Sequence, residues 1–231
     1  MRRRLTNVLL GVWAGMVLIA FTIFTGVVSC MGGPVSRSWG DLTTRRADLS
    51  GFSRIEISGV WEVEVMVGEE WSVKVEAPEG LFDYIGARTR GEVLELGWKE
   101  QHISFWNNLP TPKATVTLPR LEEVEASGAV SLSLVGLEGG RGRIELSGAG
   151  EVTGRGGHLE YLELAVSGAG DVDLTGLEVA NAEVDISGAA SVRLWVTETL
   201  TGSVSGAGSL RYKGDPVVGV DVSEMSSIKS L

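Results

Sequence analysis

Apolar and polar residues alternate along much of the chain from Gly51 onwards. In the first such stretch, glutamate or lysine lies between several members of an apolar series: Ile55, Ile57, Val63, Val65, Val67, Val73 and Val75. Alternation at a period of two residues is typical of a strand with one buried and one solvated face. Residues 93–96 and 114–118 resume the pattern. We therefore predict a set of half-buried strands in this region.

A Ser-Gly-Ala tripeptide recurs five times in the second half of the chain, between aliphatic and β-branched runs. Its glycines are Gly128, Gly148, Gly168, Gly188 and Gly206, evenly spaced except for a slightly shorter last interval. A looser copy occupies residues 58–60, and residues 223–225 stand where a further copy would fall. Regular recurrence at this period indicates a solenoid, in which each repeat buries its apolar side against its neighbours. We predict parallel β-helix-like coils of about 20 residues.

The apolar alternation continues through the tripeptide. Leu164, Val166, Gly168, Gly170 and Val172 all fall on one parity. We therefore predict a bent or bulged strand in which the repeat glycines point inward, at a place where the coil is narrow. This interpretation gives the repeat turns a structural role. Leucine-rich repeats share the period, but residues 159–164 are the only segment with their leucine pattern.

Composition supports the all-β prediction. The 231 residues include 32 glycines, and only 6% are aromatic. Glycine in a helix interior costs about 1 kcal/mol relative to alanine, so such a sequence is a poor helix former. Residues 81–85 are the only short stretch with helical spacing. The formal net charge of −10 would be repelled by a nucleic acid duplex, which argues against a nucleic acid partner.

The N-terminus has the pattern of an export signal. Three arginines at 2–4 precede an uncharged run over residues 5–28, and the only cysteine, Cys30, follows it. Residues 27–30, Val-Val-Ser-Cys, resemble a bacterial lipobox, in which the cysteine is lipidated and becomes the new N-terminus. The run is also long enough for an uncleaved spanning helix, which needs roughly 20 residues. Both alternatives place the rest of the chain outside the cytoplasm, tethered to a membrane by its N-terminal end.

Composition divides the chain into four parts. Residues 1–29 are the predicted signal peptide or membrane anchor. Residues 30–50, rich in small and polar residues, are predicted to be a flexible linker. Residues 51–120 form an N-terminal β part, and residues 121–231 form the Ser-Gly-Ala repeat.

Several motifs follow one another in a set order from Phe52. They are Ile-x-Ile-Ser-Gly at 55–59, a Val-x-Val run, a Gly-acid turn at 68–70, a Val-x-Val return and Leu-x-Asp-Tyr-Ile at 81–85. With the Ser-Gly-Ala repeats and the closing residues 222–229, this order resembles the "putative auto-transporter adhesin, head GIN domain" family. The resemblance implies an exported bacterial envelope protein with a right-handed parallel β-helix-like fold. Trp61 and the loop around Trp106 depart from the family pattern.

The sequence carries no specific signal for catalysis, a cofactor or a metal site. Histidine occurs only twice, at His102 and His158, and no serine or carboxylate lies at a telling spacing from either. One cysteine cannot supply a thiolate zinc cluster. Positions that would bear the acids of a calcium-binding nonapeptide repeat hold valine or leucine. The resemblance carries no catalytic residue over to this chain. Arg141, Arg143 and Arg155 form a basic group that we interpret as solvated charge.

Residues 101–112 are the candidate contact loop. Phe105, Trp106 and Leu109 are apolar, yet Asn107-Asn108 and the prolines at 110 and 112 favour a turn at the surface. An aromatic side chain on such a loop either contacts a glycan or protein, or caps an apolar edge.

We therefore predict a non-catalytic, membrane-tethered envelope protein that is adhesin-like or mediates contacts within the envelope, with an unknown glycan or protein ligand. The alternatives are a β-helix enzyme acting on polysaccharide and an envelope-stress accessory that binds another membrane protein.

Overall fold

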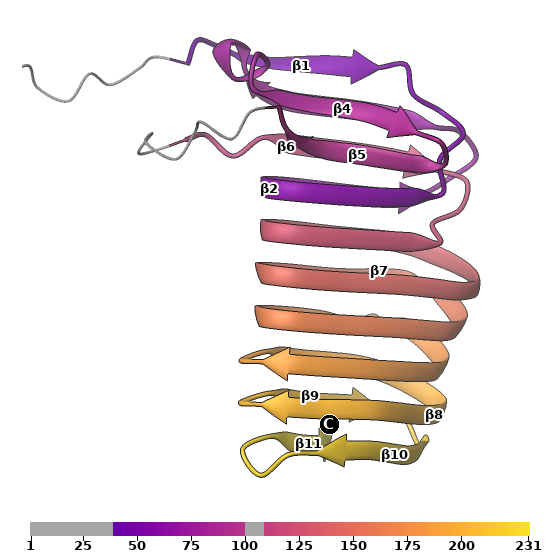
Figure 1. The fold of residues 1–231 in the computed structure, drawn as a ribbon. Helices are drawn as coiled ribbons and strands as arrows, with labels where there is room; N and C mark the ends of the chain where they lie inside the picture. The colour runs from indigo at the N-terminus through magenta and orange to yellow at the C-terminus, as the bar shows by residue number, and fades with distance from the viewer. Residues whose placement is uncertain (1–38, 100–108) are drawn as a thin grey trace, which may run out of the picture. The chain divides into compact units, whose positions relative to one another are not determined.

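Eleven strands joined in one sheet, and one short 3-10 helix, build the part of the chain that the computed structural model describes, residues 39–99 and 109–231 (Figure 1). The prediction of an all-β fold is confirmed. The elements are β1 (Leu42–Ala47), β2 (Arg54–Val67), β3 (Ser72–Pro78), η1 (Glu79–Leu81), β4 (Ile85–Arg90), β5 (Val93–Trp98), β6 (Lys113–Leu118), β7 (Glu123–Gly188), β8 (Ser191–Gly206), β9 (Ser209–Lys213), β10 (Val217–Val222) and β11 (Ser227–Ser230).

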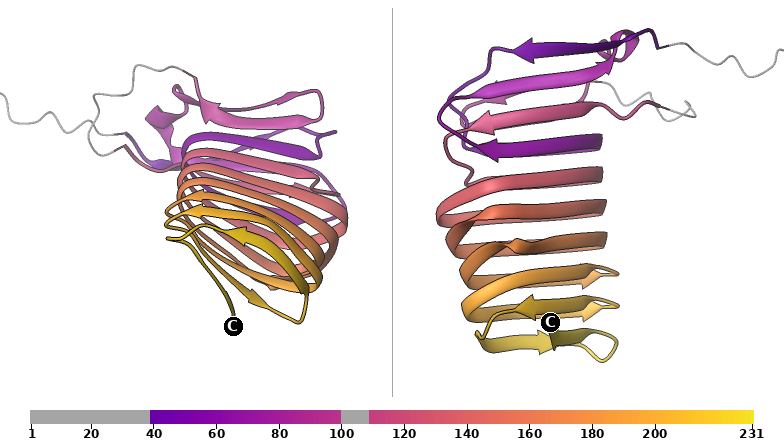
Figure 2. Two further views of the ribbon diagram at one scale, coloured as in Figure 1. Left: turned by 60° about the horizontal axis from the view of Figure 1, so that its bottom comes forward. Right: turned by 180° about the vertical axis from the view of Figure 1, so that it is seen from behind.

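From β7 onwards the chain winds in coils that stack in sequence order, and the ribbon of β7 itself continues around several corners (Figures 1 and 2). Each coil has two arms that run in opposite directions on opposite faces of the stack. We call the arm before a Ser-Gly-Ala turn arm A and the arm after it arm B. β10 pairs in parallel with the arm A portion of β8, and β11 pairs in parallel with β9 in arm B.

The shorter interval before the last repeat has a local cause. Leu174 pairs with Leu194, whereas Asn181 pairs with Thr199, so the separation between partners along the chain shortens from one pair to the other. Two register shifts lie between these pairs and account for the difference. The shorter coil is therefore accommodated at the end of arm B, and the Ser-Gly-Ala turns stay aligned.

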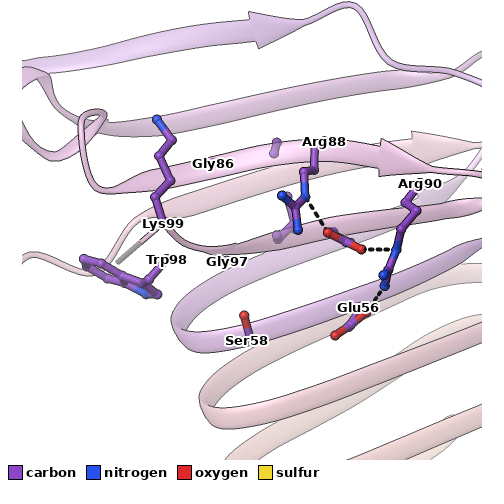
Figure 3. Close-up of a pocket in the computed structure, with 11 residues that line it drawn as sticks. Glu56, Ser58, Gly86, Arg88, Arg90, Gly97, Trp98 and Lys99 are labelled. Atoms are coloured by element: carbon purple, nitrogen blue, oxygen red, sulfur yellow. Dashed lines mark hydrogen bonds and ion pairs between the residues drawn. The ribbon is translucent and has the colours of Figure 1, made fainter. Parts of the chain in front are cut away.

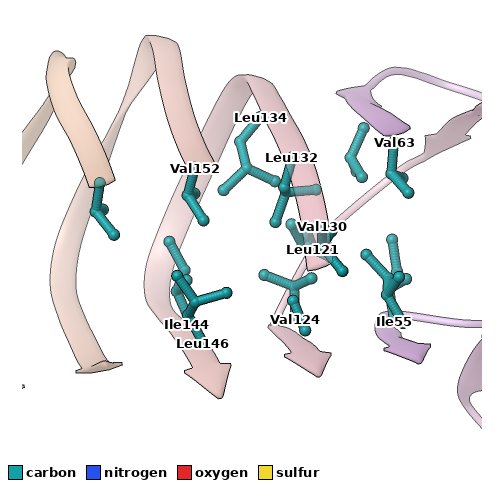
Figure 4. Packing of buried hydrophobic residues seen from close by; sticks show 14 of the residues in the cluster. Ile55, Val63, Leu121, Val124, Val130, Leu132, Leu134, Ile144, Leu146 and Val152 are labelled. Atoms are coloured by element: carbon teal, nitrogen blue, oxygen red, sulfur yellow. The ribbon is translucent and has the colours of Figure 1, made fainter. Parts of the chain in front are cut away.

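The core is a continuous column of mostly aliphatic side chains inside the stack (Figure 4). Among the described residues no polar or charged side chain is buried. Stacking at the repeat offset places equivalent side chains above one another, so each is sealed by its copies in the coils on either side. One such series comprises Leu132, Val152, Val172, Val192 and Leu210.

The repeat glycines do not point inward, and that prediction is wrong. Gly168 is exposed and adopts φ +123°, a conformation that side-chain-bearing residues rarely adopt. A Cβ atom on it would lie closer than 3.0 Å to the backbone of Gly148 in the preceding coil. The other repeat glycines share the positive φ and the collision. Parity fails here because a residue with positive φ turns the chain at a corner, so the two-residue period does not apply to it.

The N-terminal strands do not stack in sequence order. β2 lies between the coil formed by β5 and β6 and the first coil of β7, and it pairs in parallel with all three. Its Ser58-Gly59-Val60 aligns with Ser127-Gly128-Ala129, so the looser copy is a member of the same turn series. β3 and β4 then add antiparallel strands to β6 and β5, and β1 adds to β3.

Part of the predicted linker is a strand. β1 pairs with β3 along its whole length, from Leu42↔Pro78 to Ala47↔Val73. The prediction of a flexible linker is therefore wrong for these residues. It failed because an edge strand needs only one partner and keeps most of its side chains in solvent, so its sequence is polar.

The predicted signal or anchor and Cys30 lie outside the described residues, as does the first part of the predicted linker. Within residues 39–99 and 109–231, no helix combines the length and apolar content needed to cross a membrane.

Candidate functional site

A hollow of about 510 Å³ lies on the outer face of β2, β4 and β5 (Figure 3). We call it the Trp98 pocket. Outward side chains of three neighbouring strands meet there because β5 pairs with β2 in parallel and with β4 in antiparallel orientation. Its main polar and aromatic side chains are Glu56, Ser58, Arg88, Arg90, Glu95 and Trp98.

The charged side chains of the pocket form one connected group. Arg88 Nε donates a hydrogen bond to Glu95 Oε2 at 2.5 Å. Arg90 Nε lies 2.7 Å from Glu95 Oε1, and Arg90 Nη2 lies 3.8 Å from Glu56 Oε2. Glu95 is the most sheltered member, with 13% of its side chain exposed, against 74% for Arg90. The two guanidinium groups are therefore anchored at one edge and open to solvent elsewhere.

Trp98 occupies the place that another glycine turn would take. A Cβ atom on Gly59 would collide with the Trp98 ring, just as one on Gly128 would collide with Gly59. The indole therefore covers the N-terminal end of the glycine series. Its Nε1 is buried and finds no hydrogen-bond acceptor among the described residues. Trp98 as a whole is half-buried, so part of the ring faces the pocket.

Lys99 holds the far side of the pocket. Its backbone N–H donates to Tyr84 O at 2.7 Å, and its Nζ donates to Phe82 O at 2.9 Å. Figure 3 shows Lys99 and Trp98 at one end and the two arginines at the other. With three cations and two carboxylates, the lining carries a formal charge of +1, whereas the whole chain carries −10.

This arrangement is suited to binding. An indole face packs against the apolar side of a sugar ring, while the guanidinium groups are hydrogen-bond donors for hydroxyl or carboxylate oxygens. Both carboxylates of the pocket are engaged by arginine. Among the described residues no group of three or more histidine, cysteine or acidic side chains could hold a metal ion.

Of the three residues predicted as contacts, only Leu109 is described, and it does not line the Trp98 pocket. Phe105 and Trp106 lie outside the described residues, and their role stays a prediction. Leu109 is half-buried and belongs to no strand. The five repeat glycines lie at the corners of the coils, and none of them lines the Trp98 pocket. Gly59, in the looser copy of the repeat, lies against Trp98.

The basic group of the repeat is part of a charge ladder. Arg143 lies within 3.1 Å of each of three carboxylates, Glu123, Glu145 and Glu163, which come from three successive coils. Arg141 stacks over the Tyr161 ring, with its Cζ 4.7 Å from the ring centroid. Hydrogen bonding to Glu145 is the largest cause that raises the pKa of Arg143. These contacts engage the arginines in the surface of the stack.

Two carboxylates of the coils have pKa values shifted in opposite directions. Desolvation, reinforced by the charges of Glu123, Glu145 and Glu56, raises the pKa of Glu125. Desolvation also acts to raise the pKa of Asp173, but hydrogen bonds from Thr175 and the charge of Arg193 outweigh it and lower that pKa. Arg193 Nε lies 3.1 Å from Asp173 Oδ2.

Sequence reasoning missed the Trp98 pocket. Arg88, Arg90 and Glu95 alternate with less polar residues, which indicates only an outward face on a strand. Nothing in the sequence shows that β4 and β5 fold beside β2. The one available signal was Trp98-Lys99 at the end of a strand, an aromatic residue followed by a cation where a loop begins.

The chain was compared with solved structures, curated proteins and protein families. A putative adhesin from Bacteroides fragilis superposes with a TM-score of 0.64 at 20% identity, covering 83% of this chain and 97% of that one. A putative adhesin from Parabacteroides distasonis gives a TM-score of 0.49 at 17% identity, covering 83% and 98%. No protein among the curated proteins matches.

A family model described as "Putative auto-transporter adhesin, head GIN domain" matches residues 51–216. The match includes β2 to β9, and with them every strand of the Trp98 pocket. It stops before β10, so the predicted resemblance of the closing residues 222–229 is not covered. The chain belongs to the putative auto-transporter adhesin, head GIN domain family.

Proposed function

We propose that this chain is a non-catalytic adhesin-like head that binds a glycan through the Trp98 pocket. The observation that carries the proposal is the half-buried Trp98 ring, set beside two arginines that Glu95 holds in place. A rigid sheet presents these groups, which lowers the entropy cost of binding. The formal charge of +1 favours neutral or acidic sugars over cationic ligands.

The proposed head is exported and tethered to a membrane of the bacterial envelope by its N-terminal end. The family membership supports an envelope protein, and the sequence of residues 1–30 supports the tether. A lipid on Cys30 is the first form of this anchor, and an uncleaved spanning helix is the second. If Cys30 carries the lipid, Cys30→Ser should abolish fatty-acid labelling and leave a longer precursor. Unchanged mass and membrane retention would favour the spanning helix.

The finer form of the fold belongs to the same proposal. We propose that the coils form a right-handed parallel β-helix-like solenoid. Parallel pairing of each strand segment with the equivalent segment one repeat later supports the solenoid.

The glycan proposal is tested with a printed array of neutral and acidic oligosaccharides and the purified full chain. Trp98→Ala should weaken the strongest signals at least about tenfold, as expected for loss of a central aromatic contact. Arg88→Ala should weaken the binding of acidic sugars more than the binding of neutral sugars.

Trp71→Ala is the matched control. Trp71 is 42% exposed, and its Nε1 donates to Phe52 O at 2.9 Å, but it does not line the pocket. Its removal should leave glycan binding unchanged. Equal binding by the Trp98→Ala variant and the wild type would overturn the proposal, as would the absence of any signal on the array.

A further inference from the structure

The last coil leaves an open edge at the C-terminal end of the stack. β10 pairs only with β8, and β11 pairs only with β9, so among the described residues no strand covers their outer sides (Figures 1 and 2). Each strand therefore presents a row of backbone donors and acceptors. An edge of this kind is a template for pairing with another chain unless it is protected.

The open edge is also apolar. The exposed large hydrophobic side chains of the last coil are Val217, Val218, Val222, Met225 and Leu231. They make up five of the eight exposed large hydrophobic side chains among the described residues. Val220 and Ile228 pack against the core, so the coil is a regular member of the stack. Exposed apolar residues gathered on an unpaired edge indicate an interaction surface.

The opposite end of the stack differs in its charge. Its edge strands are β1 and β4, which carry two arginines each, Arg45 and Arg46 in β1 and Arg88 and Arg90 in β4. Three of these arginines form ion pairs with glutamates, so this edge is charged and not apolar, which protects it from pairing with another chain. β10 and β11 each contain one charged residue, Asp221 and Lys229 respectively. These two charges are opposite in sign.

The charges select between two ways of joining two copies end to end. If the twofold axis runs parallel to the strands, β10 of each copy lies beside β11 of the other, and Asp221 shares a seam with Lys229 of the partner copy. If the axis is instead perpendicular to the two faces that carry arms A and B, β10 lies beside β10 of the partner copy and β11 beside β11. Like charges then share a seam. Both arrangements produce antiparallel pairs, because arms A and B run in opposite directions. Like charges facing across strands are destabilising, so the first arrangement is favoured.

We propose that the C-terminal edge docks a second copy of this chain, with β10 of each copy paired to β11 of the other. The contact is isologous and closed, so it yields dimers. It lies at the end of the stack opposite β1, and it is independent of glycan binding at the Trp98 pocket.

The first test is sedimentation velocity of the purified full chain in detergent over a range of concentrations. The wild type should form dimers, and Val218→Lys should weaken association at least about tenfold by placing a charge at the seam. Val60→Lys is the matched control, because Val60 is 40% exposed and Val218 is 41% exposed. A monomeric wild type, open-ended growth with concentration, or a dimer that persists in Val218→Lys would each overturn the proposal.

The second test resolves the arrangement. Two variants, Asp221→Cys and Lys229→Cys, are purified separately and oxidised either alone or as a mixture. Only the mixture should gain a cross-linked dimer, above the background from Cys30 in the wild type. A cross-link in either variant alone, or none in the mixture, overturns the proposed pairing of β10 with β11.

Discussion

The strands from β7 to β11 and those from β1 to β6 show the same alternation but different topologies. From β7 onwards, successive coils are neighbours in the stack. In the N-terminal strands, β2 lies between later strands, and β1, β3 and β4 pair antiparallel. Alternation specifies which side of a strand is buried, but it does not specify the neighbour. A repeat supplies that information, because each coil fits best against a copy of itself.

The two regions also differ in their buried side chains and in the residues at the glycine turns. Aliphatic side chains fill the regular coils, whereas Phe52, Trp61 and Phe82 are buried in the N-terminal part. The candidate site lies where the regular series stops, because Trp98 takes the place of the next glycine turn. Strands outside the repeat can bring different side chains together, whereas stacked repeats mostly place equivalent residues next to one another.

The largest expected effect tests the aromatic core of the N-terminal part. Trp61 is 1% exposed, and its Nε1 donates to Ser58 O at 3.2 Å. Trp61→Ala should lower the free energy of unfolding by about 3–5 kcal/mol, as for other large core truncations. Trp98→Ala, which removes a half-buried ring, should lower the free energy of unfolding clearly less. Thermal unfolding by circular dichroism measures both, and equal costs would contradict the assignment of Trp98 to a binding surface.

A smaller effect separates backbone strain from coil-to-coil contact. Gly168→Ala should cost on the order of 3 kcal/mol, because it combines an unfavourable φ with a collision against Gly148. Gly91, in the β4–β5 turn, has φ +62° and no atom within 4 Å of a built Cβ. Gly91→Ala should therefore cost only about 1–2 kcal/mol. If chemical denaturation shows the same loss of unfolding free energy for both variants, the close approach between coils adds nothing to the cost of a side chain at Gly168.

The smallest effects concern the two shifted carboxylates of the coils. Asp173→Asn should destabilise and Glu125→Gln should stabilise the chain at neutral pH, each by about 0.5 kcal/mol. The pKa of Asp173 is lowered by folding, so its contribution is present above its unfolded pKa and is lost as pH falls through the folded pKa. The pKa of Glu125 is raised, so its penalty at neutral pH is relieved as pH falls through that value.

Melting temperatures measured from pH 7 down through the acid range of ordinary carboxyl groups give the measurement. The differences between each variant and the wild type should shrink towards the acid end. A shift of the same sign for both variants at pH 7 would contradict the opposite environments of the two carboxylates.

The all-β class, the repeat, and the buried sides of β2, β3, β5, β6 and of the coils away from the repeat glycines could be predicted from the sequence. These follow from local information, since the two-residue period and the recurrence of Ser-Gly-Ala can be read within a single coil. Three features could not be predicted from the sequence: the insertion of β2 between β6 and β7, the strand within the predicted linker, and the outward corners of the repeat glycines. The tertiary structure also placed Arg88, Arg90 and Trp98 around one pocket. Each of these depends on pairing between segments far apart in the chain, and many such pairings satisfy the same alternation of apolar and polar residues.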